Sequence, residues 1–410
     1  MRILISGAGI AGPTLAYWLA RFGFTPTIVE SAPALRSDGY IIDFWGTGFE
    51  IADRMGLLPA VRANGYMVRE VRVVNDAGAR IAGFSAAIFD KITRGRYVTI
   101  SRGELAAELF KKLAGRVETI FGDAIARIDQ SYRSVRVLFA SGVSRDFDLV
   151  IGADGLHSCV RKLTFGPSSQ FEKYLGYKAA AFEIQGYRPR DENVYVMHTE
   201  VGQQIVRYAL RDDRTTFLFT FTDNDPSCPA DLAAQKDVLR RRFARSGWES
   251  RRILDALDSV DRLYFDRVSQ IRMDPRKGLW TRGRVTLVGD AASSVSVLAG
   301  QGSSLAMTAA YILAGELHRA DGDHQKAFAR YQSLFGPFVA KKQKAAVRFA
   351  SVFGPKSPFA LDLRNRIFNL LAVQPLADFI IGRDLAARAA LPDYAESLHA
   401  SALFRPERVG

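Results

Sequence analysis

The sequence predicts an α/β protein with a discontinuous Rossmann-like domain, an inserted and mostly antiparallel β-sheet domain, and a C-terminal helical segment. Residues 1–30 place a short apolar strand, a glycine-rich turn, a helical stretch and a second strand in the order of a dinucleotide-binding unit. Residues 172–223 contain runs of aromatic and β-branched residues separated by turn residues, which predict the inserted sheet. Residues 323–350 carry a long helical pattern.

The glycine-rich turn follows the predicted strand at residues 2–6. Small residues allow a tight turn and a close approach of the backbone to a pyrophosphate. The second strand, residues 25–29, is followed by Glu30, which lies 18 residues beyond the last glycine and is placed to bind an unphosphorylated ribose. The candidate contacts of this turn are Gly7, Gly9, Ala11 and Gly12.

A second nucleotide-contacting segment is expected far downstream. Residues 285–288 form a buried apolar run, and Gly289 and Asp290 follow it at the carboxyl edge of the sheet, where ligands of such sheets lie. The segment Gly300, Gln301 and Gly302 then opens a predicted helix over residues 303–317. Its bare N–H groups at a positive helix end suit an electron-rich ring carbonyl.

A third segment, residues 152–161, reads Gly-Ala-Asp-Gly-Leu-His-Ser-Cys-Val-Arg and follows an apolar strand at residues 148–151. Together and in this order, the three segments resemble the single-component FAD-dependent aromatic hydroxylases, the flavoprotein monooxygenases related to para-hydroxybenzoate hydroxylase. The resemblance spans residue 1 to about residue 320.

The resemblance implies non-covalent FAD in the Rossmann-like site, with NADPH or NADH as the electron donor. It implies Asp290 at the flavin ribitol, Asp154 near the cofactor, and Arg102, at the start of a helix, near the flavin. It further implies a flavin C4a-hydroperoxide that transfers one oxygen atom to an aromatic or polyketide-like substrate. Many relatives have His and Pro where this chain has Ser293 and Val297, which favours a branch that includes tetracycline-inactivating enzymes.

The inserted sheet is expected to cover the flavin and to hold the substrate. Only about half of the candidate pocket residues can face the cofactor, because side chains alternate along a strand. The candidate pocket residues are Phe182, Tyr195, Met197, His198, Tyr208, Phe217, Phe219, Phe221 and Val297. The expected domains are residues 1–70, 96–168 and 276–345 for FAD, residues 71–95 and 169–275 for substrate, and residues 346–410 as the C-terminal helical segment.

Composition narrows the function classes. The net charge of +13 is spread over helical faces and accompanies no nucleic-acid-binding module, so nucleic acid is not expected as a partner. Only two cysteines occur, and neither a signal peptide nor a membrane span is visible, which predicts a cytoplasmic protein. The five histidines show no metal-ligand spacing, so no metal site is predicted. The oligomeric state stays open.

Two other functions remain open at this stage. One is a flavin oxidoreductase without oxygen insertion, either a reductase or a halogenase. Halogenases of this lineage carry a WxWxIP motif, whereas the four tryptophans here, Trp18, Trp45, Trp248 and Trp280, stand apart. The other is a non-catalytic flavoprotein that sequesters a ligand.

Overall fold

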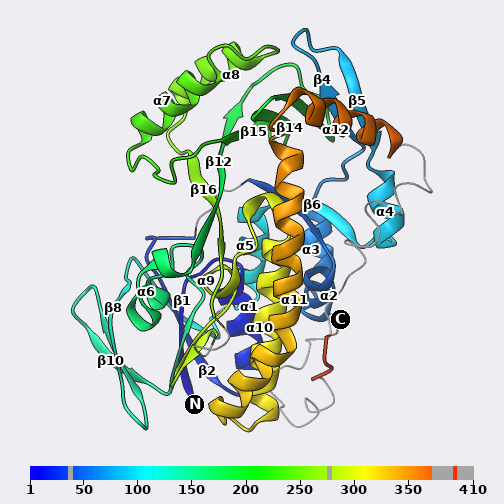
Figure 1. Ribbon diagram of the computed structural model, residues 1–410. Coiled ribbons are helices and arrows are strands. Elements are labelled where there is room, and N and C mark those ends of the chain that lie inside the picture. Colours follow the sequence, from blue (N-terminus) through cyan, green and yellow to red (C-terminus); the bar gives the residue numbers. More distant parts are fainter. Residues whose placement is uncertain (36–39, 114, 275–278, 372–390, 395–410) are drawn as a thin grey trace.

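The computed structural model describes residues 1–35, 40–113, 115–274, 279–371 and 391–394 (Figure 1). A six-stranded sheet has the order β17-β18-β11-β1-β2-β7, and all its strand pairs are parallel except the one between β17 and β18. The predicted strand, helix and strand of the glycine-rich unit are β1, α1 and β2. Their bounds and those of the other strands are β1 Arg2–Ser6, α1 Ala11–Arg21, β2 Thr25–Glu30, β7 Glu118–Phe121, β11 Leu149–Gly152, β17 Thr281–Arg282 and β18 Val285–Leu287.

Helices α10 and α11 pack beside this sheet, and α10 also contacts α1 and α2. Figure 1 shows them on one side of β1 and β2, with α6 and a small three-stranded sheet on the other side. The capping box of Ser101 and Glu104 starts α5. The bounds are α2 Thr47–Arg54, α3 Leu58–Asn64, α4 Ala87–Thr93, α5 Arg102–Lys111, α6 Cys159–Phe165, α9 Asp290–Ser293, α10 Gly302–Arg319, α11 His324–Phe353, β8 Ile125–Gln130, β9 Val135–Phe139 and β10 Ser144–Phe147.

The inserted sheet has seven strands in the order β16-β12-β15-β14-β13-β4-β5, and only the pair of β13 and β4 is parallel. Its mostly antiparallel character confirms the predicted fold class. Strands β3 and β6 pair antiparallel in a separate two-stranded sheet. The bounds are β3 Ile41–Trp45, β4 Glu70–Val74, β5 Arg80–Ser85, β6 Tyr97–Ser101, β12 Glu172–Gln185, β13 Val194–Glu200, β14 Gln203–Ala209, β15 Arg214–Thr222 and β16 Tyr264–Ile271.

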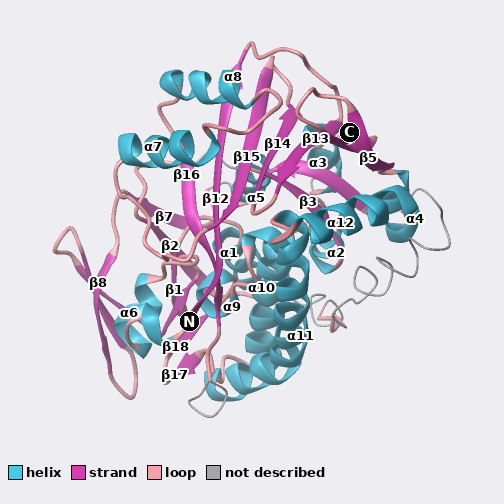
Figure 2. Cartoon of the chain, turned by 45° about the horizontal axis from the view of Figure 1, so that its top comes forward, coloured by secondary structure: helices cyan, strands magenta, loops and turns pink. Residues whose placement is uncertain are grey.

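The two faces of the seven-stranded sheet have different covers (Figure 2). Helices α7 and α8 pack on the face that we call the outer face, through apolar residues that include Leu239, Phe243 and Ile253. Helix α12 packs on the opposite, inner face through Ile367 and Phe368. The remaining bounds are α7 Leu232–Phe243, α8 Ser250–Asp255, α12 Pro358–Leu370 and the 3-10 turns Ser168–Gln170, Ala256–Ser259 and Val297–Ala299.

The C-terminal part is helical as far as the structure describes it. Helix α12 begins at Pro358 and ends at Leu370. Residues 372–390 and 395–410 of the predicted helical segment lie outside the described residues. Farther along, Tyr394 contacts α10, where its ring lies 2.2 Å from the position of a Cβ on Gly315. No helix among the described residues is both long and apolar enough to cross a membrane.

Candidate active site

The turn between β1 and α1 requires glycine at two positions. Gly7 has φ +105°, and a Cβ there would lie 2.6 Å from the carbonyl oxygen of Ala153. A Cβ on Gly12 would lie 1.9 Å from the carbonyl oxygen of Gly7. Both distances are far shorter than a van der Waals contact, so the turn closes against the end of β11 only with these residues. At Gly9 the nearest atom to a Cβ is Nη2 of Arg102, at 3.6 Å, so glycine is not required there by the fold itself.

Glu30 ends β2 beside this turn, as the sequence predicts. One carboxylate oxygen accepts a hydrogen bond from the N–H of Ala8 at 2.8 Å, and the other accepts one from the N–H of Ala32 at 2.9 Å. Both bonds hold the carboxylate at the carboxyl end of the strand, which is where a ribose of a bound dinucleotide would lie.

The downstream segment meets the same turn. Gly289 has φ +61°, and a Cβ on it would lie 3.0 Å from the Cβ of Ala11. A Cβ on Gly302 would lie 3.9 Å from Oδ1 of Asp290. Residues nearly 300 positions apart therefore surround one place, at the carboxyl edge of the six-stranded sheet. The backbone of Gly300 is left-handed, with φ +62°, and a Cβ on it would meet nothing within 4 Å.

Asp290 and Arg102 form the charged part of this place. Burial raises the pKa of Asp290 above its usual value, and the positive charge of Arg102 opposes that rise. Arg102 is the first residue of α5, and its guanidinium lies beside Gly9. The arginine predicted to lie near the flavin is thus next to both the glycine-rich turn and Asp290.

Asp154 is held by hydrogen bonds within its own loop. Its carboxylate accepts hydrogen bonds from the hydroxyl of Ser158 at 2.5 Å and from the N–H of Val160 at 3.0 Å, so it is engaged within its own loop. The buried Arg161 extends from the same loop and donates to the carbonyl oxygens of Ala291 at 2.9 Å and Leu156 at 2.6 Å. This middle segment therefore braces the loop that carries Asp290, a role that no local sequence motif indicates.

Two tyrosines that the sequence analysis missed join the inserted sheet to this site. Tyr264 on β16 lies opposite Ala181 on β12, and its ring centroid is 5.2 Å from that of Tyr40. Burial raises the pKa of each tyrosine, and Arg102 lies close enough to both to oppose the rise. The face that carries Tyr264, the inner face, is therefore the one turned toward the cofactor segments.

Four of the predicted pocket residues lie on this inner side. Tyr195 and Tyr208 pack together with ring centroids 4.7 Å apart, and Met197 packs under α12. Val297 packs with Ala179 on the same side of the sheet. The predicted residues that the structure brings to the inner side are Tyr195, Met197, Tyr208 and Val297.

Asp43 on β3 adds an acidic group that the sequence analysis also missed. Its Oδ1 accepts hydrogen bonds from Tyr97 and Thr99, each at 2.7 Å, and from Tyr195 at 3.2 Å. Burial raises the pKa of Tyr97 and of Tyr195, and the neighbouring Asp43 raises both further, so these hydroxyls stay protonated and donate. No local motif marks Asp43, because only the pairing of β3 with β6 and its approach to β13 bring the group together.

The other five predicted pocket residues are on the wrong side for this site. Four of them, Phe182, Phe217, Phe219 and Phe221, pack on the outer face with the aromatic and aliphatic residues of α7 and α8. His198 also points outward, where its Nε2 lies 2.9 Å from Asp76 and its ring stacks on Trp248. The correction has a simple cause, because alternate side chains of one strand must face opposite ways and the sequence does not state which set faces the ligand.

Asp76, His198 and Glu200 each offer a possible metal-ligand atom, and these atoms lie within 4.8 Å of one another although the three residues have no metal-ligand spacing in the sequence. The buried imidazole of His198 already has Asp76 as its partner.

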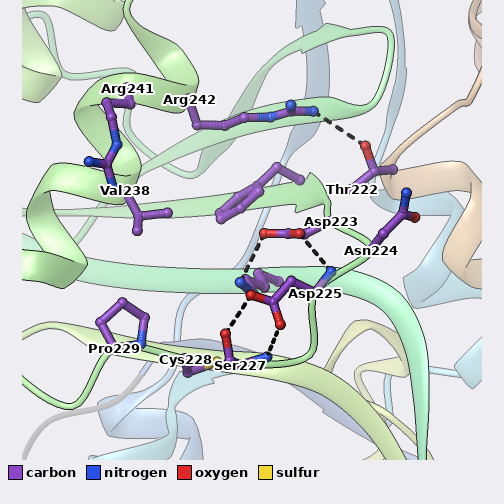
Figure 3. A pocket seen from close by; sticks show the side chains of 12 residues that line it. Thr222, Asp223, Asn224, Asp225, Ser227, Cys228, Pro229, Val238, Arg241 and Arg242 are labelled. Carbon is purple, nitrogen blue, oxygen red and sulfur yellow. Dashed lines mark hydrogen bonds and ion pairs between the residues drawn. The ribbon is translucent and has the colours of Figure 1, made fainter.

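An open pocket of about 970 Å³ lies on the outer face, under α7 (Figure 3). Lys178 forms an ion pair with Asp223 at 2.8 Å on its floor, and Arg241 and Arg242 line its helical side. Lys178 lies directly opposite Phe221 on the sheet, and Phe221 packs against α7, so the pocket is on the side of the sheet away from the cofactor segments. It is a hollow separate from the candidate active site.

The glycine-rich turn, Glu30, Asp290 and the N-terminus of α10, which together we call the cradle, fit an adenine dinucleotide that carries a flavin. The glycine-rich turn leaves no room for Cβ atoms at Gly7 and Gly12, and Glu30 stands at its ribose side. At the other end, Asp290 and the N-terminus of α10 offer a carboxylate for ribitol hydroxyls and free N–H groups for a ring carbonyl.

Comparisons with known proteins agree with this geometry. The family model described as "FAD binding domain" matches residues 1–327. A flavin-dependent monooxygenase from an unknown prokaryotic organism is 38% identical over 353 residues, which cover 83% of this chain and 87% of that protein. A flavin-dependent monooxygenase from Legionella longbeachae is 34% identical over 349 residues, covering 84% and 87%. The crystal structure of the tetracycline destructase Tet(55) is 34% identical, covers 96% of this chain and 98% of that chain, and gives a TM-score of 0.81.

The chain belongs to the FAD-binding family of flavin-dependent monooxygenases. It is an FAD-dependent monooxygenase. The resemblance noted in the sequence is thereby confirmed at the level of the family and the fold.

Proposed function

We propose that the enzyme oxygenates an aromatic or polyketide-like small molecule that binds between the inner face of the seven-stranded sheet and the cofactor segments. The observation that carries the proposal is the convergence of Tyr264 from the sheet with Tyr40, Arg102 and Asp290. A substrate on the inner face would lie next to the flavin, and the structural likeness to a tetracycline destructase supports a polyketide-like scaffold.

FAD, when bound and reduced by NADPH or NADH, supplies the activation of molecular oxygen. The protein then has to bind the cofactor and the substrate, orient them, and exclude water. We assign binding of the dinucleotide to Gly7, Gly9, Ala11, Gly12 and Glu30, and binding of the flavin end to Arg102, Asp290, Gly300, Gln301 and Gly302. Asp154 holds its own loop through Ser158 and Val160, and Arg161 from the same loop holds the loop of Asp290 in place.

The inner face of the sheet supplies the groups that orient the substrate and exclude water. Tyr40 and Tyr264 pack against each other at the junction between the sheet and the cofactor segments and keep water away from it. Asp43 fixes the hydroxyls of Tyr97 and Tyr195 in a polar wall beside Tyr208. A dry pocket with a few fixed polar groups is the usual form of a small-molecule site and limits wasteful loss of reducing equivalents as peroxide.

Labelled molecular oxygen tests the reaction. With a substrate present, one labelled oxygen atom should enter each product molecule, and NADPH or NADH consumption without substrate should be slow and yield hydrogen peroxide. Incorporation of oxygen from water would contradict the proposal. Equal turnover in the absence of oxygen would show instead an oxidoreductase that inserts no oxygen.

The choice of first substrate follows from the comparisons. Tetracycline, phenols and other polyketides should be screened for stimulation of NADPH or NADH consumption by the FAD-loaded protein. The same preparation tests the cofactor, because acid should release all the flavin as FAD. Flavin that remains attached to the denatured chain would contradict non-covalent binding.

A further inference from the structure

The open pocket under α7, which we call the outer pocket, is built from three parts of the chain (Figure 3). Lys178 on β12 lies at its floor, the loop at residues 223–229 forms one side, and Arg241 and Arg242 on α7 form the other. Its volume of about 970 Å³ falls within the range of small-molecule sites. Because the outer pocket lies on the face of the sheet away from the cofactor segments, a ligand bound there would be separate from the flavin.

The two carboxylates that line the outer pocket already have partners within the protein. Oδ1 of Asp223 accepts a hydrogen bond from the N–H of Asp225 at 2.9 Å, and Oδ2 pairs with Lys178 at 2.8 Å. Asp225 accepts hydrogen bonds from the N–H of Ser227 at 2.9 Å and from its hydroxyl at 2.5 Å. The bonds from Ser227 hold the pKa of Asp225 below its usual value. Both acids are therefore engaged in shaping the loop, and neither pairs with an arginine of α7.

Lys178 brings a buried ammonium group to the floor of the outer pocket. The residue is only 4% exposed, and Asp223 is its one ion-pair or hydrogen-bond partner among the described residues. An ammonium group has three N–H donors, so two donors of Lys178 remain open. A buried charge is costly unless it is paired and hydrogen-bonded, and the outer pocket is the space from which a further acceptor can reach it.

Two guanidinium groups of α7 line the same space with open donors. Arg241 forms no hydrogen bond or ion pair with any described residue. Arg242 uses only Nη2, which donates to the carbonyl oxygen of Gly202 at 3.4 Å and to the hydroxyl of Thr222 at 3.3 Å. Both bonds are long, and both acceptors are uncharged. Arg240, the residue before them, does not line the pocket and pairs with two carboxylates, so the lack of an acidic partner is confined to the two arginines of the pocket.

We propose that the outer pocket binds a small organic oxyanion, whose phosphate or carboxylate oxygens accept hydrogen bonds from Lys178, Arg241 and Arg242. The three cations have open N–H donors and the acids of the pocket are engaged, so the pocket has an excess of donors and of positive charge. Guanidinium groups bind oxyanions through pairs of parallel hydrogen bonds. Val238 and Pro229 add apolar surface for the carbon skeleton of the ligand. The net charge of +13 attracts anions to such a site.

Pyrophosphate and citrate are the probes, because one offers phosphate oxygens and the other carboxylate oxygens. Each is titrated by isothermal calorimetry into the FAD-loaded protein, and sodium chloride keeps the ionic strength constant. FAD fills the cradle in this preparation, so the probes cannot bind there. At least one of the two anions should bind saturably, and the tighter one identifies the kind of oxyanion that the pocket takes. Binding of neither would overturn the proposal. Since no turnover is involved, the result does not depend on the reaction at the flavin.

The matched variants are Arg241→Gln and Arg242→Gln, with Arg245→Gln as the control. Arg245 lies just beyond the end of α7, is exposed, and does not line the outer pocket. Arg241→Gln and Arg242→Gln should each weaken binding of the tighter anion at least about fivefold, because each removes charge-assisted donors. Arg245→Gln should leave binding within about twofold, because salt screens an exposed charge outside the pocket. Equal weakening by all three would show a general attraction of anions to a basic surface and would overturn the proposal.

The two cysteines report where the anion binds. Cys228 lines the outer pocket and is partly buried, whereas Cys159 is exposed at the start of α6. A saturating concentration of the tighter anion should slow the alkylation of Cys228 by iodoacetamide and leave that of Cys159 unchanged, as measured by mass spectrometry of the digested protein. An unchanged rate at Cys228, or equal protection of both cysteines, would place the anion outside the pocket and overturn the proposal.

Discussion

Replacing Gly302 by Asp tests whether the N-terminus of α10 acts on the flavin. Gly302 is the first residue of this 18-residue helix, and no acidic residue lies in its first turn. The aligned peptide dipoles place about half a positive charge at this end of a helix. A carboxylate at Gly302 would cancel that charge. The new side chain has room to begin, because the nearest atom to a Cβ is Oδ1 of Asp290, at 3.9 Å.

The expected size of the effect follows from two interactions. A helix N-terminus in a partly buried site stabilises an anion by up to about 2 kcal/mol. If that anion is the reduced flavin, loss of the stabilisation lowers the two-electron reduction potential by roughly 40 mV. In addition, two carboxylates about 5 Å apart repel by about 3 kcal/mol at an effective dielectric constant of 20, so Asp290 raises the pKa of the introduced carboxyl. The lowering should therefore be larger at pH 8.5 than at pH 6, because more of the carboxyl is ionised.

The assay is a dye-coupled reductive titration of the FAD-loaded variants at both pH values. Gly302→Asn is the matched control, since it has the same shape and no charge, and Ser303→Ala leaves the helix end intact. Potentials for Gly302→Asp and Gly302→Asn that agree within a few millivolts, with FAD bound in both, would refute the orientation of the flavin toward α10.

Three further predictions concern the cradle. Asp290→Ala should weaken FAD binding by about 1.5–3 kcal/mol, the usual contribution of a hydrogen bond to a charged group, and an unchanged affinity in a titration of the apoprotein would remove Asp290 from the site. Gly12→Ala should give a protein without FAD and with a lower unfolding temperature, because its Cβ would lie 1.9 Å from a carbonyl oxygen. Gly9→Ala should keep the circular dichroism of the wild type and weaken FAD binding by about tenfold. Equal loss of folding in both variants would contradict the different roles of the two glycines. Arg161→Leu should lower the free energy of unfolding in urea by about 2–4 kcal/mol, because it leaves two carbonyl oxygens without their donor, and an effect no larger than that of the exposed Arg133→Leu would show that this brace is dispensable.

The cofactor segments could be predicted from the sequence because their signals are local. A tight turn that approaches a backbone needs glycine, and the structure shows that a side chain at Gly7 or Gly12 would overlap a carbonyl oxygen. Strand, glycine and acid then follow one another at fixed spacing, as at Gly289 and Asp290. Each of these requirements lies within a few residues, so the chain itself determined the class of cofactor and the α/β fold.

The side of the sheet that faces the cofactor segments was decided by the tertiary structure alone. The alternation along β15 gave two sets of residues, and the aromatic set, which includes Phe217 and Phe219, looked like the pocket but packs against α7 and α8. The set with Thr216 and Thr220 faces the cofactor segments instead. The alternation of side chains along a strand fixes which residues share a face of the sheet. It does not fix which face packs on helices and which faces the cofactor segments, because that depends on helices and strands more than a hundred residues away.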